Sequence, residues 1–187
     1  MFYKKFLVLC SIFTVSFSTV NFASASVDKQ ATFQMGASSF GPGEVMFAQE
    51  MIPHHQQAIQ MSKFALINST NPKVLSLARN IINAQASEIV RMNRWLKVAS
   101  AGMASGMDMG MQGMLTEQQL KVLGKLKGSK FDRLYLTEMI FHHKGALKSV
   151  SIIANSRNAE AKALSLSISS TQSAEISKMQ SILATIK

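Results

Sequence analysis

Residues 50–58 read EMIPHHQQA, and residues 138–146 repeat that stretch as EMIFHHKGA. The two copies lie 88 residues apart and together contain all four histidines of the chain. Neutral imidazole is the commonest metal-ligating side chain in proteins, and packing alone gives no reason to repeat a histidine pair. The duplication therefore predicts a two-fold internal repeat built around ligand-type side chains.

The apolar residues recur at helical spacing, which predicts an all-α fold. Helices are expected over residues 44–68, 72–99, 116–126, 129–154 and 158–187. The expected N-caps of the last four are Asn71, Thr116, Ser129 and Asn158. The buried face of the first helix should contain Phe47, Met51, His54, Ala58, Met61 and Ala65. That of the second should contain Leu75, Ala78, Ile82, Gln85, Ile89, Met92 and Leu96.

A second repeated pattern accompanies the histidines. Gln85, Glu88, Ile89 and Met92 recur 87 residues later as Gln172, Glu175, Ile176 and Met179. Each half then reads as a helical hairpin, with the first at 44–99 and the second at 129–187. Two packed hairpins predict a four-helix bundle domain over 44–187, with residues 100–128 as a methionine-rich connection that includes the short helix.

The N-terminal residues look like a targeting segment rather than part of the fold. Two lysines precede an apolar stretch, and Ala23-Ser24-Ala25 fits a signal-peptidase site. We expect residues 1–25 to be a signal peptide and residues 26–43 a flexible leader, which predicts a periplasmic or secreted protein without a membrane span. Cys10 lies within the signal, so no disulfide or thiolate chemistry is expected after cleavage.

The chain is basic, with a formal charge of +10 that falls to +8 when the two lysines of the signal are removed. The lysines are scattered, whereas nucleic-acid binding favours a concentrated basic stripe. We therefore expect no nucleic-acid partner. A basic surface suits contact with an acidic chaperone or efflux-pump domain.

The repeated helices carry soft and borderline metal ligands on shared faces. Thioether sulfur favours Cu(I), imidazole also binds copper, and Ag(I) and Cu(II) are further candidates. Such neutral ligands should tolerate burial around a monovalent ion better than around a multivalent one. The candidate ligands in the helices are Met51, His54, His55, Met61, Met92, Met139, His142, His143 and Met179.

The connection between the halves offers a second group of thioethers. Residues 102–114 read GMASGMDMGMQGM, a glycine-rich stretch in which methionines cannot form an ordinary helical core stripe. The candidate ligands here are Met103, Met107, Met109, Met111 and Met114. A sticky flap or an oxidant sink is the alternative interpretation.

The two halves are not identical. Pro53 interrupts the first histidine helix and should kink it, whereas Phe141 stands at the equivalent place in the second. Ser149 stands where the second copy of Met61 would be. The two sites are therefore not expected to bind metal equally.

These motifs resemble the domain-of-unknown-function 305 family. The resemblance is carried by residues 51–61, 84–96 and 131–146 and by the Gly-Met stretch, and it covers nearly the whole chain after the signal. It implies a ferritin-like four-helix bundle in a secreted or periplasmic protein, with members implicated in copper binding and copper tolerance.

Three functions remain open from the sequence. The leading one is a Cu(I)/Ag(I)-binding protein, not an enzyme, that buffers or hands on copper. The second is a di-iron or di-manganese oxidase using Glu50, Glu88, Glu138 and Glu175. Such centres use Glu-x-x-His motifs, and Pro53 and Phe141 occupy the positions that a histidine would need. The third is a helical interaction module without metal.

Overall fold

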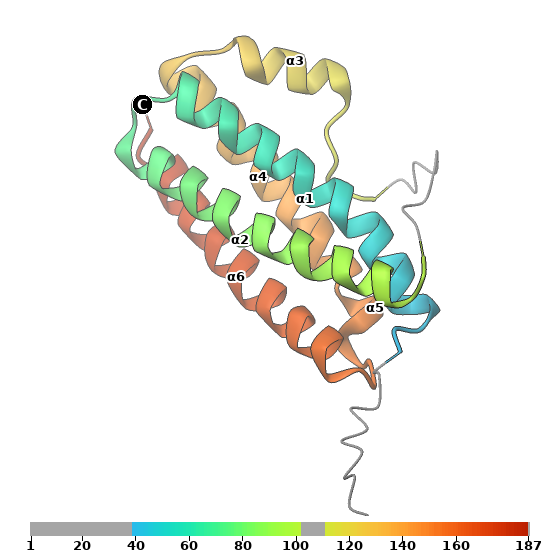
Figure 1. Cartoon of the computed structure of the whole chain (residues 1–187). Helices are drawn as coiled ribbons and strands as arrows, with labels where there is room; N and C mark the ends of the chain where they lie inside the picture. Colours follow the sequence, from blue (N-terminus) through green and yellow to red (C-terminus); the bar gives the residue numbers. More distant parts are fainter. Residues whose placement is uncertain (1–38, 102–110, 187) are drawn as a thin grey trace, which may run out of the picture. The chain divides into compact units, whose positions relative to one another are not determined.

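The computed structural model describes residues 39–101 and 111–186, and all regular structure in those residues is helical (Figure 1). The all-α prediction is confirmed. No described helix is long and apolar enough to cross a membrane. The helices are α1 (Pro42–Asn68), α2 (Pro72–Val98), α3 (Glu117–Lys125), α4 (Gly128–Ser149), α5 (Ser151–Ala154) and α6 (Ala159–Leu183).

Helix α1 begins two residues before the predicted start. Gly41 is its N-cap and Pro42 its first residue, a position where proline loses no hydrogen bond. The Gly-Pro-Gly sequence therefore starts the helix, so residues 42 and 43 belong to α1 and not to the predicted leader. The predicted signal peptide (1–25) and residues 26–38 of the leader lie outside the described residues. The helix continues through Pro53, and all six residues of its predicted buried face are buried.

Helix α2 has the predicted cap but a rotated buried face. The Asn71 side chain accepts a hydrogen bond from the backbone N–H of Lys73 at 3.0 Å. Three predicted core residues, Leu75, Ile82 and Ile89, are only partly buried. The buried stripe instead contains Val74, Leu77, Ile81, Glu88 and Trp95, with Ala78, Gln85, Met92 and Leu96 as predicted. Helix α2 packs against both α1 and α6, and its buried stripe is the one that these two neighbours cover.

The later helix ends follow local hydrogen bonding. Thr116 and Gln119 form the predicted capping box of α3, and Asn158 caps α6 by accepting from the N–H groups of Glu160 and Ala161. Ser129 does not cap α4, which begins one residue earlier at Gly128, a residue with φ +57.

The predicted continuous helix from 129 to 154 is interrupted at Val150. The Ser151 hydroxyl donates to the carbonyl of Lys148 at 2.8 Å. Serine in this arrangement competes with the backbone ladder, and the chain resumes as the short helix α5.

The four long helices pack in a ring. Helix α1 contacts α2 and α4, and α6 contacts α4 and α2, which gives the two hairpins of the predicted bundle (Figure 1). The buried apolar residues fall into two clusters. The first contains Ala58, Ile81, Met139 and Met179. The second contains Met51, Met92, Ala146 and Ile168.

Candidate metal centre

A layer of buried polar side chains separates the two apolar clusters. On each long helix, the polar residues lie between one residue of the first cluster and one of the second. The layer contains His54 and His55 from α1, Gln85 and Glu88 from α2, His142 and His143 from α4, and Gln172 and Glu175 from α6. The sequence repeat therefore becomes a two-fold polar layer in an apolar core.

Two members of the layer pair across each hairpin. His55 Nε2 lies 2.7 Å from Glu88 Oε2, and His143 Nε2 lies 2.7 Å from Glu175 Oε2. In each pair the imidazole N–H donates to the carboxylate, so Nδ1 holds the lone pair. A histidine that ligates a metal commonly donates its other N–H to a carboxylate in this way.

The remaining two histidines meet between the hairpins. The ring centroids of His54 and His142 are 3.6 Å apart, with 34° between the ring planes. Burial, reinforced by electrostatic repulsion from neighbouring His55, lowers the pKa of His54 to about 3. Burial and the facing His54 lower the pKa of His142 well below its usual value. The backbone of His54 has a smaller, opposite effect on this pKa, but no hydrogen bond forms between it and the His142 ring. Both imidazoles are neutral at physiological pH, as metal ligation requires.

Many nitrogens in this layer have no partner. In the described part of the chain, five buried imidazole nitrogens make no hydrogen bond: Nδ1 of His54, His55 and His143 and both nitrogens of His142. The amide groups of Gln85 and Gln172 are also unpartnered. Each such group costs about 1–3 kcal/mol in an apolar interior. A bound cation would offset that cost for the atoms that carry a lone pair, so these atoms fit a metal ion.

Carboxylates contribute little to this donor set. Within residues 39–101 and 111–186, no three His, Cys, Asp or Glu side chains are grouped so that they could hold an ion by themselves. Glu88 and Glu175 are engaged by histidines, while Glu50 and Glu138 are only partly buried. Any ion bound here would need further donors of another type.

Methionines lie on both sides of the layer. Met51 and Met92 belong to one apolar cluster, and Met61, Met139 and Met179 belong to the other, all fully buried. Met111 is partly buried and packs against the cluster of Met51 and Met92. Met114 is partly buried as well, and the predicted ligands Met103, Met107 and Met109 lie outside the described residues.

Sequence reasoning missed the residues that hold the end of the connection at the histidines. Residues 111–115, called the strap below, contact His54, Gln57 and Gly145. The available signal was the repeat itself. Position 57 carries glutamine and its copy, position 145, carries glycine, within otherwise similar motifs.

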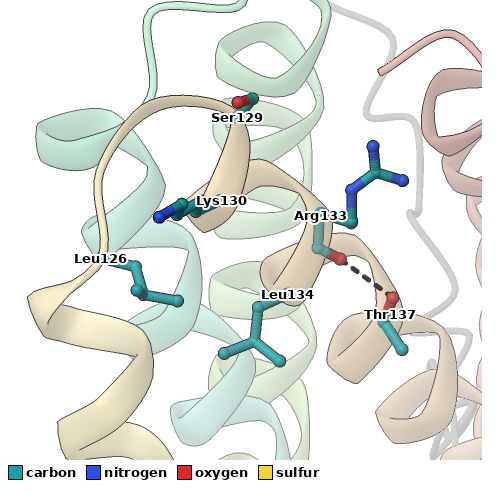
Figure 2. A pocket seen from close by; sticks show the side chains of 6 residues that line it. All are labelled: Leu126, Ser129, Lys130, Arg133, Leu134 and Thr137. Atoms are coloured by element: carbon teal, nitrogen blue, oxygen red, sulfur yellow. Dashed lines mark hydrogen bonds between the residues drawn. The ribbon is translucent and has the colours of Figure 1, made fainter. Parts of the chain in front are cut away.

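One surface pocket of the described residues lies away from this layer. It has a volume of about 580 Å³ and is lined by Leu126, Ser129, Lys130, Arg133, Leu134 and Thr137 (Figure 2). The Thr137 hydroxyl donates to the carbonyl of Arg133 at 2.9 Å, as Figure 2 shows. None of the predicted ligands lines this pocket.

Solved structures share this architecture. A DUF305 protein from Streptomyces coelicolor, described as a candidate secreted protein, has 31% identity and a TM-score of 0.72, over 79% of this chain and 92% of that chain. CopM in the Cu(II)-bound form has 33% identity and a TM-score of 0.63, over 75% of this chain and 95% of that chain. CopM in the Cu(I)-bound form has 33% identity and a TM-score of 0.61, over 74% and 93%.

The sequence comparisons agree with the structural ones. An uncharacterised protein of Acanthamoeba polyphaga mimivirus is 46% identical over 43 residues, and the match spans 23% of this chain and only 28% of the viral protein. The profile of a domain of unknown function, DUF305, matches residues 44–183. This range extends from the first turn of α1 to the end of α6 and contains both histidine pairs. The chain therefore belongs to the DUF305 family.

Proposed function

We propose that this protein binds Cu(I), and Ag(I) in the same way, through imidazole nitrogens and thioether sulfurs at the polar layer. The observation that carries the proposal is the set of five unpartnered imidazole nitrogens in a buried layer with methionine clusters on both sides. Imidazole and thioether together suit copper and silver better than hard cations.

The charge of the site favours a monovalent ion. His54 and His142 are neutral, and Glu88 and Glu175 each accept a hydrogen bond from a histidine. A layer built mainly from neutral donors stabilises a buried Cu⁺ with less uncompensated charge than it would leave around Zn²⁺ or Fe³⁺. The Cu(I)- and Ag-bound forms of CopM agree with that choice, and CopM has also been solved in a Cu(II)-bound form.

The biological role we propose is copper buffering, transfer or tolerance outside the cytoplasm, without enzymatic activity. The signal-like N-terminus supports that location, and the basic composition suits an acidic chaperone or pump domain as partner. The alternative is a di-metal oxidase, which the spacing disfavours because Pro53 and Phe141 occupy the positions that a Glu-x-x-His motif would need.

The test is an anaerobic competition titration, in which the protein withdraws Cu(I) from a chromogenic chelator. One variant replaces Met51, Met92, Met139 and Met179 by leucine, a swap that nearly conserves volume and keeps the fold. A second replaces Met103, Met107, Met109, Met111 and Met114 by leucine. Met46→Leu is the matched control, because this α1 methionine is 39% exposed.

We expect wild type and Met46→Leu to compete equally, and the four-methionine variant to lose tight binding. If only the five-methionine variant loses tight Cu(I) binding, the main site lies in the connection. A folded wild-type chain that withdraws no Cu(I) or Ag(I) would refute the proposal.

A further inference from the structure

The strap touches both halves of the repeat at one equivalent position. Gln57 on α1 and Gly145 on α4 are separated by 88 residues, the same offset as His54 from His142. Both contact residues 111–115, but by opposite means. Gln57 binds the strap through its side chain, whereas Gly145 contacts it through the absence of a side chain.

Gln57 holds the strap through two hydrogen bonds. Its Nε2 donates to the carbonyl of Leu115 at 2.9 Å, and its Oε1 accepts from the N–H of Leu115 at 2.6 Å. Gln57 is buried, and so is Leu115. An amide side chain that satisfies both backbone groups of one residue fixes the position of that residue in the way a β-ladder pair would.

Gly145 lets the strap backbone lie directly on α4. A Cβ atom at position 145 would stand 1.6 Å from the carbonyl oxygen of Gln112. Gly113 has φ +95, and a Cβ there would stand 2.8 Å from the Cα atom of His142. Both contacts exclude any side chain, because the opposing atoms belong to the backbone and cannot rotate away.

The consequence is a hydrogen bond to one of the two facing histidines. His54 Nε2 lies 3.3 Å from the carbonyl oxygen of Gln112. A carbonyl oxygen only accepts, so His54 must carry its proton on Nε2 and its lone pair on Nδ1. Glu88 and Glu175 impose the same tautomer on His55 and His143. His142 has no such acceptor.

We infer that Gln57 and Gly145 are positioning residues whose joint role is to seat the Gln112 carbonyl on His54. That contact leaves the lone pair of His54 on Nδ1, as the glutamate contacts do for His55 and His143, so Nδ1 is the atom through which His54 can bind a metal. The inference rests on the proposed function for the identity of the metal. The three histidines with an acceptor have a fixed tautomer before metal binds, whereas His142 can adopt either tautomer.

The test uses Gly145→Ala in the full chain. Replacing a helical glycine by alanine ordinarily stabilises a helix, but here the new methyl group displaces the Gln112 carbonyl. Gly43→Ala is the matched control, since its Cβ would lie 3.9 Å from the Ile152 side chain in ordinary contact. Gln57→Ala is the second variant, because it releases Leu115 without creating a clash.

Two quantities are measured in each protein. Long-range ¹H–¹⁵N correlation spectra of the metal-free chain report which nitrogen of His54 is protonated. Competition titration reports Cu(I) affinity. We expect wild type and Gly43→Ala to show the Nε2–H tautomer at His54. We expect Gly145→Ala and Gln57→Ala to lose that single tautomer and to bind Cu(I) about 10–100-fold more weakly, the usual cost of removing a partner of a metal-ligating histidine.

A His54 that keeps the Nε2–H tautomer in both variants overturns the inference, and so does Cu(I) affinity within about twofold of wild type. If Gly145→Ala does not fold, Gln57→Ala decides. If the wild-type chain binds no Cu(I), the proposed function fails, and the tautomer of metal-free His54 still decides whether Gln57 and Gly145 position it.

Discussion

The two hairpins carry the same histidine motif but differ in what surrounds it. In both, a histidine donates to a glutamate of the neighbouring helix at 2.7 Å. Only the first has an acceptor for the other histidine, because the connection crosses the site once and delivers one carbonyl, that of Gln112, to His54. A duplicated sequence therefore gives a symmetric layer and an asymmetric site, since a single strap cannot satisfy two equivalent groups.

The methionines show a similar asymmetry between the two halves. The first helix has Met61, but its copy is Ser149. Met61 lies in the apolar cluster that holds Met139 and Met179, and Met111 of the strap packs against the cluster that holds Met51 and Met92. Each cluster thus contains or contacts three described methionines. The third is the helical Met61 in one cluster and Met111 of the strap in the other.

The largest stability effect should come from this unequal pair. Met61→Ala removes a fully buried side chain and should lower the free energy of unfolding by about 2–5 kcal/mol, through lost burial and the resulting cavity. Ser149→Ala, at a half-buried position, should change it by less than about 0.5 kcal/mol. Urea unfolding of the metal-free chain measures both. Equal effects would mean that the two positions are structurally equivalent after all.

Exchanging the residues before the histidine pairs tests the backbone asymmetry. Phe141 is 57% exposed, so Phe141→Ala should cost little. Phe141→Pro removes a helical hydrogen bond and should cost about 3 kcal/mol. The reverse change, Pro53→Ala, should stabilise α1. Thermal unfolding compares the three, and a destabilised Pro53→Ala chain would show that the tertiary structure requires proline there.

The symmetric part of the site should respond symmetrically. Glu88→Ala and Glu175→Ala each leave a buried imidazole N–H without its acceptor and should each cost about 1–3 kcal/mol. The glutamine variants keep an oxygen acceptor and should recover much of that loss. Unfolding free energies that differ strongly between the two alanine variants would contradict the equivalence of the two histidine–glutamate pairs.

The smallest effect concerns the strap methionines. Met111→Leu should weaken Cu(I) binding by about tenfold, which corresponds to about 1.4 kcal/mol, if Met111 supplies the thioether that Ser149 cannot. Met46→Leu is the matched control, because this α1 methionine is 39% exposed and is not a candidate ligand. Equal affinities of the two variants in the competition titration would remove Met111 from the site.

Much of the architecture was predictable because its signals are local. The caps at Asn71, Thr116 and Asn158 formed as expected, since a capping side chain needs only backbone groups two or three residues away. The break at Val150 and the failure of Ser129 to cap α4 were not predictable in this way. There, a serine bond to an earlier carbonyl and a left-handed Gly128 competed with the helical pattern.

By itself, the sequence determined the helices, the two-fold repeat and the chemical class of the side chains in the layer, because period and composition are properties of the chain alone. Only the tertiary structure decided which face of α2 is buried, which histidine nitrogens have partners, and that residues 111–115 rest on Gly145. Those features depend on contacts such as Gln57 with Leu115 and His54 with Gln112, each spanning 58 residues. No local pattern encodes the distance between such groups, since packing of the whole bundle sets it.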